Sequence, residues 1–311
     1  MASAHPRLIF GGSTLGEDYK TLEEAQDILA LARSLGIHEV DTAALYPITD
    51  MGRSEKFLGE MQAIAQGIAV DTKILVLSKD ANGTLEPDKI RTSLENSRKS
   101  LQLDSSQKLN ITIPPPIQDQ AKTLDELHKQ GFFDKLGVSN WPLDMLNNFL
   151  GVCEREGYVK PTVYQGNYNL LQRGHEALMP TLRKHGIRFD AHSPVAGGML
   201  SGKLTSGDTE GTRFGKDNMI GTYSKMNYDK PELHAAVRYV HELVKPANIT
   251  PIEAALRWIS YHSMLGPDDS IILGASKSSY LKSNVEAIQK GPLPEDIAAG
   301  MEKVWDLASG K

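Results

Sequence analysis

Three residues near the start of the chain, Asp41, Tyr46 and Lys73, could together donate a proton to a bound molecule. A free tyrosine has a pKa of roughly 10 and is a poor acid at neutral pH, but a nearby ammonium group lowers that pKa by stabilising the phenolate. In such a unit, Asp41 would keep Lys73 charged and in place. Each residue alone also has an ordinary interpretation, in which Asp41 caps a loop, Lys73 is solvated and Tyr46 packs at a rim. The functional interpretation therefore requires a fold that brings the three side chains together.

Eight short apolar runs are predicted to form β-strands, and most are followed by a segment with the apolar periodicity of a helix. At the first helix, Thr21 and Glu24 have the spacing of a capping box, and Gly36 follows the last apolar position. The strands are expected at residues 7–10, 39–43, 69–74, 109–113, 136–139, 162–165, 188–191 and 271–274. The helices are expected at residues 22–35, 53–65, 87–101, 121–130, 143–156, 175–185, 231–244, 251–263, 278–288 and 295–308.

This alternation of strands and helices predicts parallel strands joined by right-handed crossovers. Eight such units fit a single (β/α)8 TIM barrel domain over residues 1–311, since about 250 residues is typical of that fold. The surplus consists of a Gly-, Ser- and Thr-rich loop at 195–230, after the seventh strand, an extra helix at 251–263 and a terminal helix at 295–308. An open doubly wound sheet is the alternative, but its G-x-G-x-x-G phosphate-binding pattern is absent after the first strand, at residues 11–16.

In a TIM barrel the active site lies at the carboxyl ends of the strands. Asp41 and Lys73 lie near the carboxyl ends of two successive predicted strands, and Tyr46 follows the first of these strands, which favours the proton-donor interpretation. The other polar candidates at strand ends are Ser139, Asn140, Gln165, Asn167, His192, Ser193, Ser276 and Lys277.

Composition excludes several classes of function. The formal net charge of -5 comes without a run of Lys and Arg, so neither a nucleic-acid nor an anionic-membrane surface is expected. No apolar run reaches the roughly 18 residues of a spanning helix, and acidic residues in the first thirty argue against a signal peptide. Cys153 is the only cysteine, which rules out an intrachain disulfide and a thiolate metal cluster, and we expect a cytoplasmic protein. No histidine falls in a metal-ligand pattern, and monomer and homodimer remain equally open.

Seven short motifs are spread in order along nearly the whole chain. They are Val40-Asp-Thr-Ala-Ala-Leu-Tyr46, Gly52-Arg-Ser-Glu-Lys-Phe-Leu-Gly59, Asp71-Thr-Lys73, Gly137-Val-Ser-Asn-Trp141, Thr162-Val-Tyr-Gln-Gly-Asn-Tyr168, Ser193-Pro-Val-Ala-Gly-Gly198, and Ile272-Leu-Gly-Ala-Ser276 through Asn284. These motifs resemble those of the aldo-keto reductases, most closely the aflatoxin-aldehyde reductase branch and its fungal relatives. The resemblance agrees with the barrel predicted from the order of strands and helices.

The resemblance implies an NADPH-dependent reductase of a small carbonyl compound. Hydride would pass from the nicotinamide to the carbonyl carbon, while Tyr46, tuned by Lys73 and Asp41, protonates the oxygen. By the same resemblance, the nicotinamide would be held by Ser139, Asn140, Gln165, His192 and Ser193. Arg213 would lie in the loop that closes over the pyrophosphate. The adenosine 2′-phosphate, which distinguishes NADP(H) from NAD(H), would be held by Ser276, Lys277 and Asn284.

The chain departs from the family pattern at two positions. Pro114 stands where the family has a histidine that hydrogen-bonds the substrate carbonyl, and proline has no side-chain donor. His192 stands where the family usually has an aromatic residue, often Tyr, stacked on the nicotinamide. An imidazole can also stack, or it can act as an acid in place of the missing donor, or it can be a hydrogen-bonded histidine without a role in the reaction.

Two other functions remain open because of Pro114. One is a cofactor-binding protein with little redox turnover. The other is a redox-neutral enzyme for dehydration or cyclisation on the same barrel, with Tyr46 as acid and His192 as base.

Overall fold

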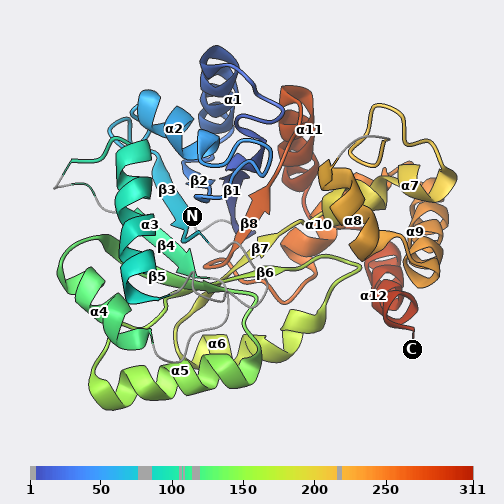
Figure 1. Cartoon of the computed structure of the whole chain (residues 1–311). Helices are drawn as coiled ribbons and strands as arrows, with labels where there is room; N and C mark the ends of the chain where they lie inside the picture. Colours follow the sequence, from blue (N-terminus) through green and yellow to red (C-terminus); the bar gives the residue numbers. More distant parts are fainter. Residues whose placement is uncertain are drawn as a thin grey trace.

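In the computed structural model, eight parallel strands close into a barrel in sequence order, as Figure 1 shows. The structure describes residues 5–75, 86–104, 107, 109–113, 120–215 and 219–310. Strand β1 pairs with both β2 and β8, so the barrel has no break, and the predicted fold class is confirmed. The strands are β1 (Arg7–Gly11), β2 (Glu39–Asp41), β3 (Ala69–Lys73), β4 (Leu109–Ile113), β5 (Phe133–Ser139), β6 (Val163–Asn167), β7 (Arg188–His192) and β8 (Ser270–Leu273).

Helices surround the strands (Figure 1). The first begins with the predicted capping box, because the Thr21 hydroxyl accepts from the Glu24 backbone N–H and the Glu24 carboxylate accepts from the Thr21 N–H. These helices are α1 (Leu22–Ser34), α2 (Arg53–Glu60), α3 (Pro87–Ser100), α4 (Ala121–Lys129), α5 (Leu143–Glu156), α6 (Met179–Lys184), α10 (Pro251–Tyr261) and α11 (Ser278–Gln289). Short 3-10 turns occur at η1 (Gly12–Thr14), η2 (Gly174–Leu178) and η4 (Lys245–Ala247).

A second pair of helices, α9 (Pro231–Val244) and α12 (Glu295–Ser309), packs together outside α10 (Figure 1). Helix α10 is buried at seven consecutive positions, 254–260. A helix that is buried all round has neighbours on every side, so α10 lies between the strands and the outer pair. The sequence predicted 251–263 as the extra helix, whereas the helices farther from the strands are α9 and α12.

The segment 195–230, which we call the strap, is not the continuous loop predicted from its composition. It contains η3 (Ala196–Ser201), α7 (Lys203–Ser206) and α8 (Met219–Tyr228). Positive φ angles at Gly202 and Gly207 end the first two of these short helices, so the glycines that suggested a loop are the boundaries between helices.

Two predicted helices have different limits in the structure. Helix α2 stops at Glu60 instead of residue 65, and Gln62 takes a positive φ of 52°. The preceding turn packs tightly on α3, since a Cβ at Gly59 would lie 2.1 Å from the Ser100 carbonyl oxygen. The helix predicted at 175–185 divides into η2 and α6, with Pro180 in the first turn of α6.

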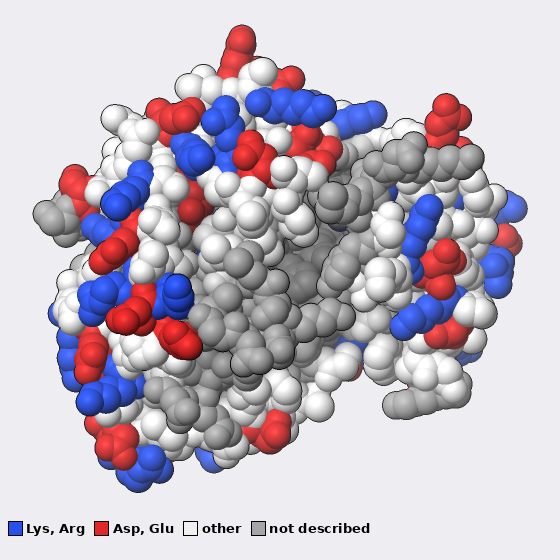
Figure 2. All heavy atoms as spheres, viewed as in Figure 1, with Lys and Arg blue, Asp and Glu red and all other residues white. Residues whose placement is uncertain are grey.

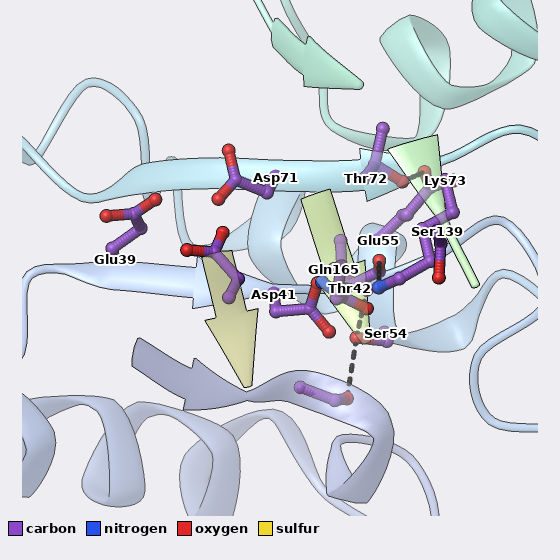
Figure 3. Close-up of polar contacts among 12 residues, drawn as sticks. Glu39, Asp41, Thr42, Ser54, Glu55, Asp71, Thr72, Lys73, Ser139 and Gln165 are labelled. Atoms are coloured by element: carbon purple, nitrogen blue, oxygen red, sulfur yellow. Dashed lines mark hydrogen bonds and ion pairs between the residues drawn. The ribbon is translucent and has the colours of Figure 1, made fainter. Parts of the chain in front are cut away.

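Charged side chains occupy one layer of the barrel interior, nearer the amino ends of the strands than Asp41. Arg188 Nη2 lies 2.8 Å from Glu39 Oε1, 3.1 Å from Asp190 Oδ2 and 3.6 Å from Asp71 Oδ2. Figure 3 shows Glu39 and Asp71 side by side on β2 and β3. Burial, a hydrogen bond to Glu39 and the nearby carboxylates raise the pKa of Asp71 well above its ordinary value. Burial also raises the pKa of Asp190 to about 6.

On the face shown in Figure 2, basic and acidic side chains are mixed around the periphery and neither sign forms a continuous stripe. Among the described residues, no helix combines the length and the apolar character needed to cross a membrane. In the same part of the chain, no group of three or more His, Cys, Asp and Glu could hold a metal ion.

Candidate active site

Asp41, Lys73 and Gln165 meet at the carboxyl ends of β2, β3 and β6 (Figure 3). Lys73 Nζ donates to Asp41 Oδ1 at 2.6 Å and to the Thr42 carbonyl oxygen at 2.9 Å. Gln165 Nε2 donates to the same Asp41 oxygen at 2.8 Å. Burial alone would lower the pKa of Lys73, but Asp41 and Tyr46 raise it above its ordinary value. Lys73 is therefore a charged ammonium held in one position.

Tyr46 lies beside this ammonium. Its backbone is fixed on both sides, because its N–H donates to Ala43 at 2.9 Å and its carbonyl accepts from Ser54 at 3.1 Å. Lys73 Nζ lies 5.0 Å from the centre of the tyrosine ring. Lys73 lowers the pKa of Tyr46, but burial and the Asp41 carboxylate raise it, and the net pKa is above its ordinary value. The phenol is protonated at neutral pH, as a proton donor must be.

Ser139, Asn140 and Gln165 lie next to one another, because β5 and β6 align Ser139 with Gln165. Asn140 takes a positive φ of 56°, its backbone N–H donates to the Gln165 carbonyl at 3.0 Å, and its amide donates to Ser139 Oγ at 3.0 Å. An αL conformation is sparsely populated outside glycine but is tolerated by asparagine. The three residues form a cluster of amides and a hydroxyl beside the Asp41–Lys73 pair. The Gln165 side chain, expected to hold the nicotinamide carboxamide, donates from Nε2 to Asp41.

His192 and Ser193 lie at the end of β7, where His192 is aligned with Asn167 of β6. His192 Nδ1 is 3.1 Å from Ser193 Oγ. Burial, the Lys73 ammonium and His175 lower the pKa of His192 to about 3. The imidazole is therefore neutral at physiological pH. A neutral imidazole with so low a pKa is disfavoured as a general acid and is also a weak base, whereas it can still stack on a ring.

The four residues predicted to hold phosphate groups lie in the strap and in or just before α11. Arg213 is exposed in the strap, and its Nη1 is 3.8 Å from the position that a Cβ would take at Gly197. Burial raises the pKa of Asp18, and Arg213 partly offsets that rise, so the strap reaches the segment after β1. Ser276 and Lys277 are exposed immediately before α11, and Asn284 is buried within it.

A supporting layer was missed from the sequence, although two of its residues lie in the Gly52–Gly59 motif. Ser54 Oγ is 2.7 Å from Thr42 Oγ1 (Figure 3), and it donates to the Gly12 carbonyl at 2.9 Å. Thr72 Oγ1 donates to Glu55 Oε1 at 2.6 Å. These bonds tie α2 to η1, to the residue that follows β2, and to β3. They hold the two strand ends that carry Asp41 and Lys73.

A cavity of about 360 Å³ opens between the segments that follow β5 and β6. Its walls include Asn140, Trp141, Asn167, Gln172 and His175. Burial lowers the pKa of His175, so these walls are uncharged at neutral pH. Pro114, the position of the missing family histidine, lies outside the described residues, and β4 ends at Ile113.

Comparison with known proteins supports the resemblance seen in the motifs. The model of the Aldo/keto reductase family matches residues 7–306. The chain is 35% identical over 279 residues to an aldo-keto reductase of Pseudocercospora fijiensis, covering 86% of this chain and 93% of that protein. It is 31% identical to the aflatoxin B1 aldehyde reductase member 2 of Mus musculus, covering 99% of this chain and 87% of that protein. It is also 31% identical to the oxidoreductase sirO of Leptosphaeria maculans, with coverages of 98% and 96%.

Among solved structures, a glycerol dehydrogenase from Gluconobacter oxydans aligns with a TM-score of 0.74 at 23% identity, covering 100% of this chain and 98% of that one. At this identity the likeness establishes the fold. The family match over nearly the whole barrel and the relatives above 30% identity show that this chain is an oxidoreductase of the aldo/keto reductase family.

Proposed function

We propose that the protein is an NADPH-dependent reductase of small carbonyl compounds, or of related C=N or C=C acceptors, with Tyr46 as the proton donor. The observation that carries the proposal is the buried Asp41–Lys73 ion pair at 2.6 Å, with its ammonium 5.0 Å from the Tyr46 ring centre. This arrangement is a charged, fixed donor group beside a protonated phenol. The aldehyde reductase named among the relatives is consistent with this class of substrate.

NADPH, when bound, supplies the hydride that adds to the carbonyl carbon. Tyr46 then gives its proton to the carbonyl oxygen, and Lys73 stabilises the phenolate that remains. Asp41 keeps Lys73 oriented, and the bond from Gln165 to Asp41 keeps the carboxylate oriented in turn. Positioned proton transfer typically contributes about 10²–10⁴-fold in rate, so Tyr46 is expected to dominate the chemical step.

The residues present fit such a cofactor. Ser139 and Asn140 offer a hydroxyl and an amide for a carboxamide, and His192 offers a neutral ring for stacking. In the strap, Nη1 of the cationic Arg213 lies 3.8 Å from the Cβ position of Gly197, and a guanidinium there suits a pyrophosphate. Lys277, exposed before α11, adds a second cation that favours the phosphorylated cofactor.

The two alternatives receive unequal support. A redox-neutral reaction with His192 as base is disfavoured, because a pKa of about 3 makes the imidazole a weak base. A cofactor-binding protein with little turnover remains the second candidate, because Pro114 replaces the family donor. Losing one such donor costs roughly 10²–10³ in rate where it has been measured, which predicts a slow reductase.

The deciding experiment measures NADPH binding by fluorescence and NADPH consumption with a panel of aldehydes and ketones. We expect micromolar or tighter binding and measurable consumption, and Tyr46→Phe should lower consumption by about 10²-fold or more while leaving the NADPH Kd within about twofold. Binding without consumption of NADPH by any carbonyl would favour the second candidate. Absence of binding, or unchanged turnover in Tyr46→Phe, would overturn the proposal.

A further inference from the structure

We propose that Tyr228, at the end of α8 in the strap, is a positioning residue that holds the His192–Ser193 corner through two asparagines. Tyr228 thereby couples the position of the strap to the position of His192 and Ser193, the residues expected to hold the nicotinamide ring. The effect of Tyr228 on the reaction rests on the proposed function. The mechanical link between the strap and the His192–Ser193 corner rests on the hydrogen bonds alone.

The link is a continuous chain of hydrogen bonds. Asn167 Nδ2, at the end of β6, donates to Tyr228 Oη at 3.2 Å. Asn169 Nδ2 donates both to Asn167 Oδ1 at 3.0 Å and to the Ser193 carbonyl oxygen at 2.9 Å. Asn169 Oδ1 in turn accepts from the Leu171 backbone N–H at 2.9 Å. The chain therefore runs from the strap, across the end of β6, to the residue that follows β7.

The orientation of each amide in this chain is determined. Asn169 is fully buried, and its carbonyl oxygen is fixed by the Leu171 N–H, so its two N–H bonds must point to Asn167 and Ser193. Asn167 must then present its oxygen to Asn169 and its nitrogen to Tyr228. A flipped Asn167 would place two NH₂ groups against each other. The Tyr228 hydroxyl is the acceptor that completes the chain.

The far end of the chain is a backbone that needs external support. Ser193 has a φ of 58°, and a residue outside glycine keeps such a conformation only when its surroundings hold it. Asn169 holds the Ser193 carbonyl, and the Tyr168 N–H donates to the His192 carbonyl at 3.2 Å. Ser193 Oγ is 3.1 Å from His192 Nδ1, so the rotation of the imidazole depends on where this backbone lies.

The near end of the chain is a contact point of the strap. Tyr228 is 6% exposed, and its ring is 3.7 Å from the Cβ position of Gly197. Arg213 Nη1 and Ser224 Oγ lie 3.8 Å and 4.0 Å from the same position. Tyr228, which accepts from Asn167, thus packs beside Gly197 together with the cationic Arg213. By this inference, opening of the strap breaks the Tyr228–Asn167 bond and so releases the His192–Ser193 corner.

The test is Tyr228→Phe, which removes the acceptor and keeps the ring. Tyr261→Phe is the matched control, since it also removes a hydrogen-bonded tyrosine hydroxyl, here one that donates at 2.8 Å to the Ile288 carbonyl between α10 and α11. We expect Tyr228→Phe to speed NADPH dissociation by about 5–50-fold and to slow single-turnover hydride transfer severalfold, while Tyr261→Phe does neither. In an Asn167→Ala background, Tyr228→Phe should have less than a twofold effect, because the chain is already broken.

A readout that needs no cofactor separates this inference from the proposed function. Hydrogen–deuterium exchange of residues 193–198 should be faster in Tyr228→Phe and unchanged in Tyr261→Phe. If the wild type fails to bind NADPH while Tyr228→Phe still loosens 193–198, the proposed function is wrong and the mechanical link stands. If exchange and NADPH dissociation are both unaltered in Tyr228→Phe, or if its effect is the same with and without Asn167, the inference is wrong.

Discussion

Asp41 is the residue on which the polar contacts of the barrel mouth converge. A single carboxylate oxygen accepts from both Lys73 and Gln165, and the Asp41 and Lys73 side chains are only 7% and 12% exposed. A buried pair of this kind contributes little net stability, but removal of one member leaves an uncompensated charge. The pair is best understood as a device that fixes the ammonium beside Tyr46.

Lys73→Met should expose this dependence, because methionine keeps the apolar part of the side chain and removes the charge. We expect a loss of roughly 3–5 kcal/mol in the free energy of unfolding, measured by urea denaturation, since Asp41 is left buried with Gln165 alone. Adding Asp41→Asn to this variant should recover most of that loss, because no charge then remains. A loss below about 1 kcal/mol in Lys73→Met would mean that water solvates Asp41 and the pair is not effectively buried.

The sequence predicted the residues of this mouth better than it predicted their partners. Asp41 and Lys73 meet as expected because strand ends of a parallel barrel share one face. The bond from Gln165 to Asp41 was not predicted, since a glutamine amide has several possible partners. Only the distances between side chains in the folded protein show which partner it bonds. The hydrogen-bond chain from Tyr228 to Ser193 was also missed. It joins residues from separate segments, and no sequence motif marks the two asparagines as partners.

At the level of strands, the charged layer around Arg188 sets how stability depends on pH. Burial raises the pKa of Asp190 to about 6, although Arg188 lowers it and Glu39 raises it further. A carboxyl group with a folded pKa above its unfolded value of 3.8 stabilises the fold at low pH. That contribution is lost as the pH rises through about 6.

Asp190→Asn should remove this dependence. Between pH 5 and pH 8, the free energy of unfolding of the wild type relative to Asp190→Asn should fall by roughly 1–1.5 kcal/mol. In this range Asp190 is already ionised in the unfolded chain, whereas in the folded protein it still has to lose its proton. Urea denaturation at several pH values would measure this difference, with Asp27→Asn, an exposed carboxylate on α1, as control. A difference independent of pH, or one that grows as the pH rises, would show that Asp190 ionises in the ordinary range.

Helix and strand boundaries show where local sequence rules stop. The capping box at Thr21 was predicted and is present, because both partners are three residues apart. The end of α2 was not, because it depends on the close approach of Gly59 to α3, a contact between separate elements. The strap was predicted as a loop since glycine composition signals breaks but does not reveal the short helices between them.

At the level of the whole molecule, α12 serves as the outer cover of α10. Trp258 on α10 is fully buried and donates from Nε1 to Glu302 on α12 at 3.0 Å. Ile297, Met301 and Val304 of α12 are also buried. The closed barrel was predictable by counting strands, and α12 was expected as a surplus helix. The other surplus helix was predicted to be α10, whereas it is α9, because an amphipathic pattern does not specify which neighbour a helix packs against.

Removing residues 295–311 should therefore uncover the apolar surfaces of α9 and α10. We expect a red shift of tryptophan fluorescence, strong binding of a hydrophobic dye and a cooperative transition at lower urea, because those surfaces lose their cover. Removing only residues 310 and 311 provides the control. Wild-type fluorescence and stability in the longer truncation would show that α12 is dispensable for the core.

The pairing of β1 with β8 also governs how the chain is made. Residues 7–10 pair with residues 270–273. One edge of the first strand to leave the ribosome therefore has no pairing partner until the eighth strand has been synthesised. Until then the nascent sheet has two open edges, which are templates for pairing with other chains. Contacts this distant in sequence form slowly, and partly folded chains of this size aggregate readily. Closure of the barrel is thus a step that follows synthesis, and the yield of active protein in a cell will depend on protecting those two edges during translation.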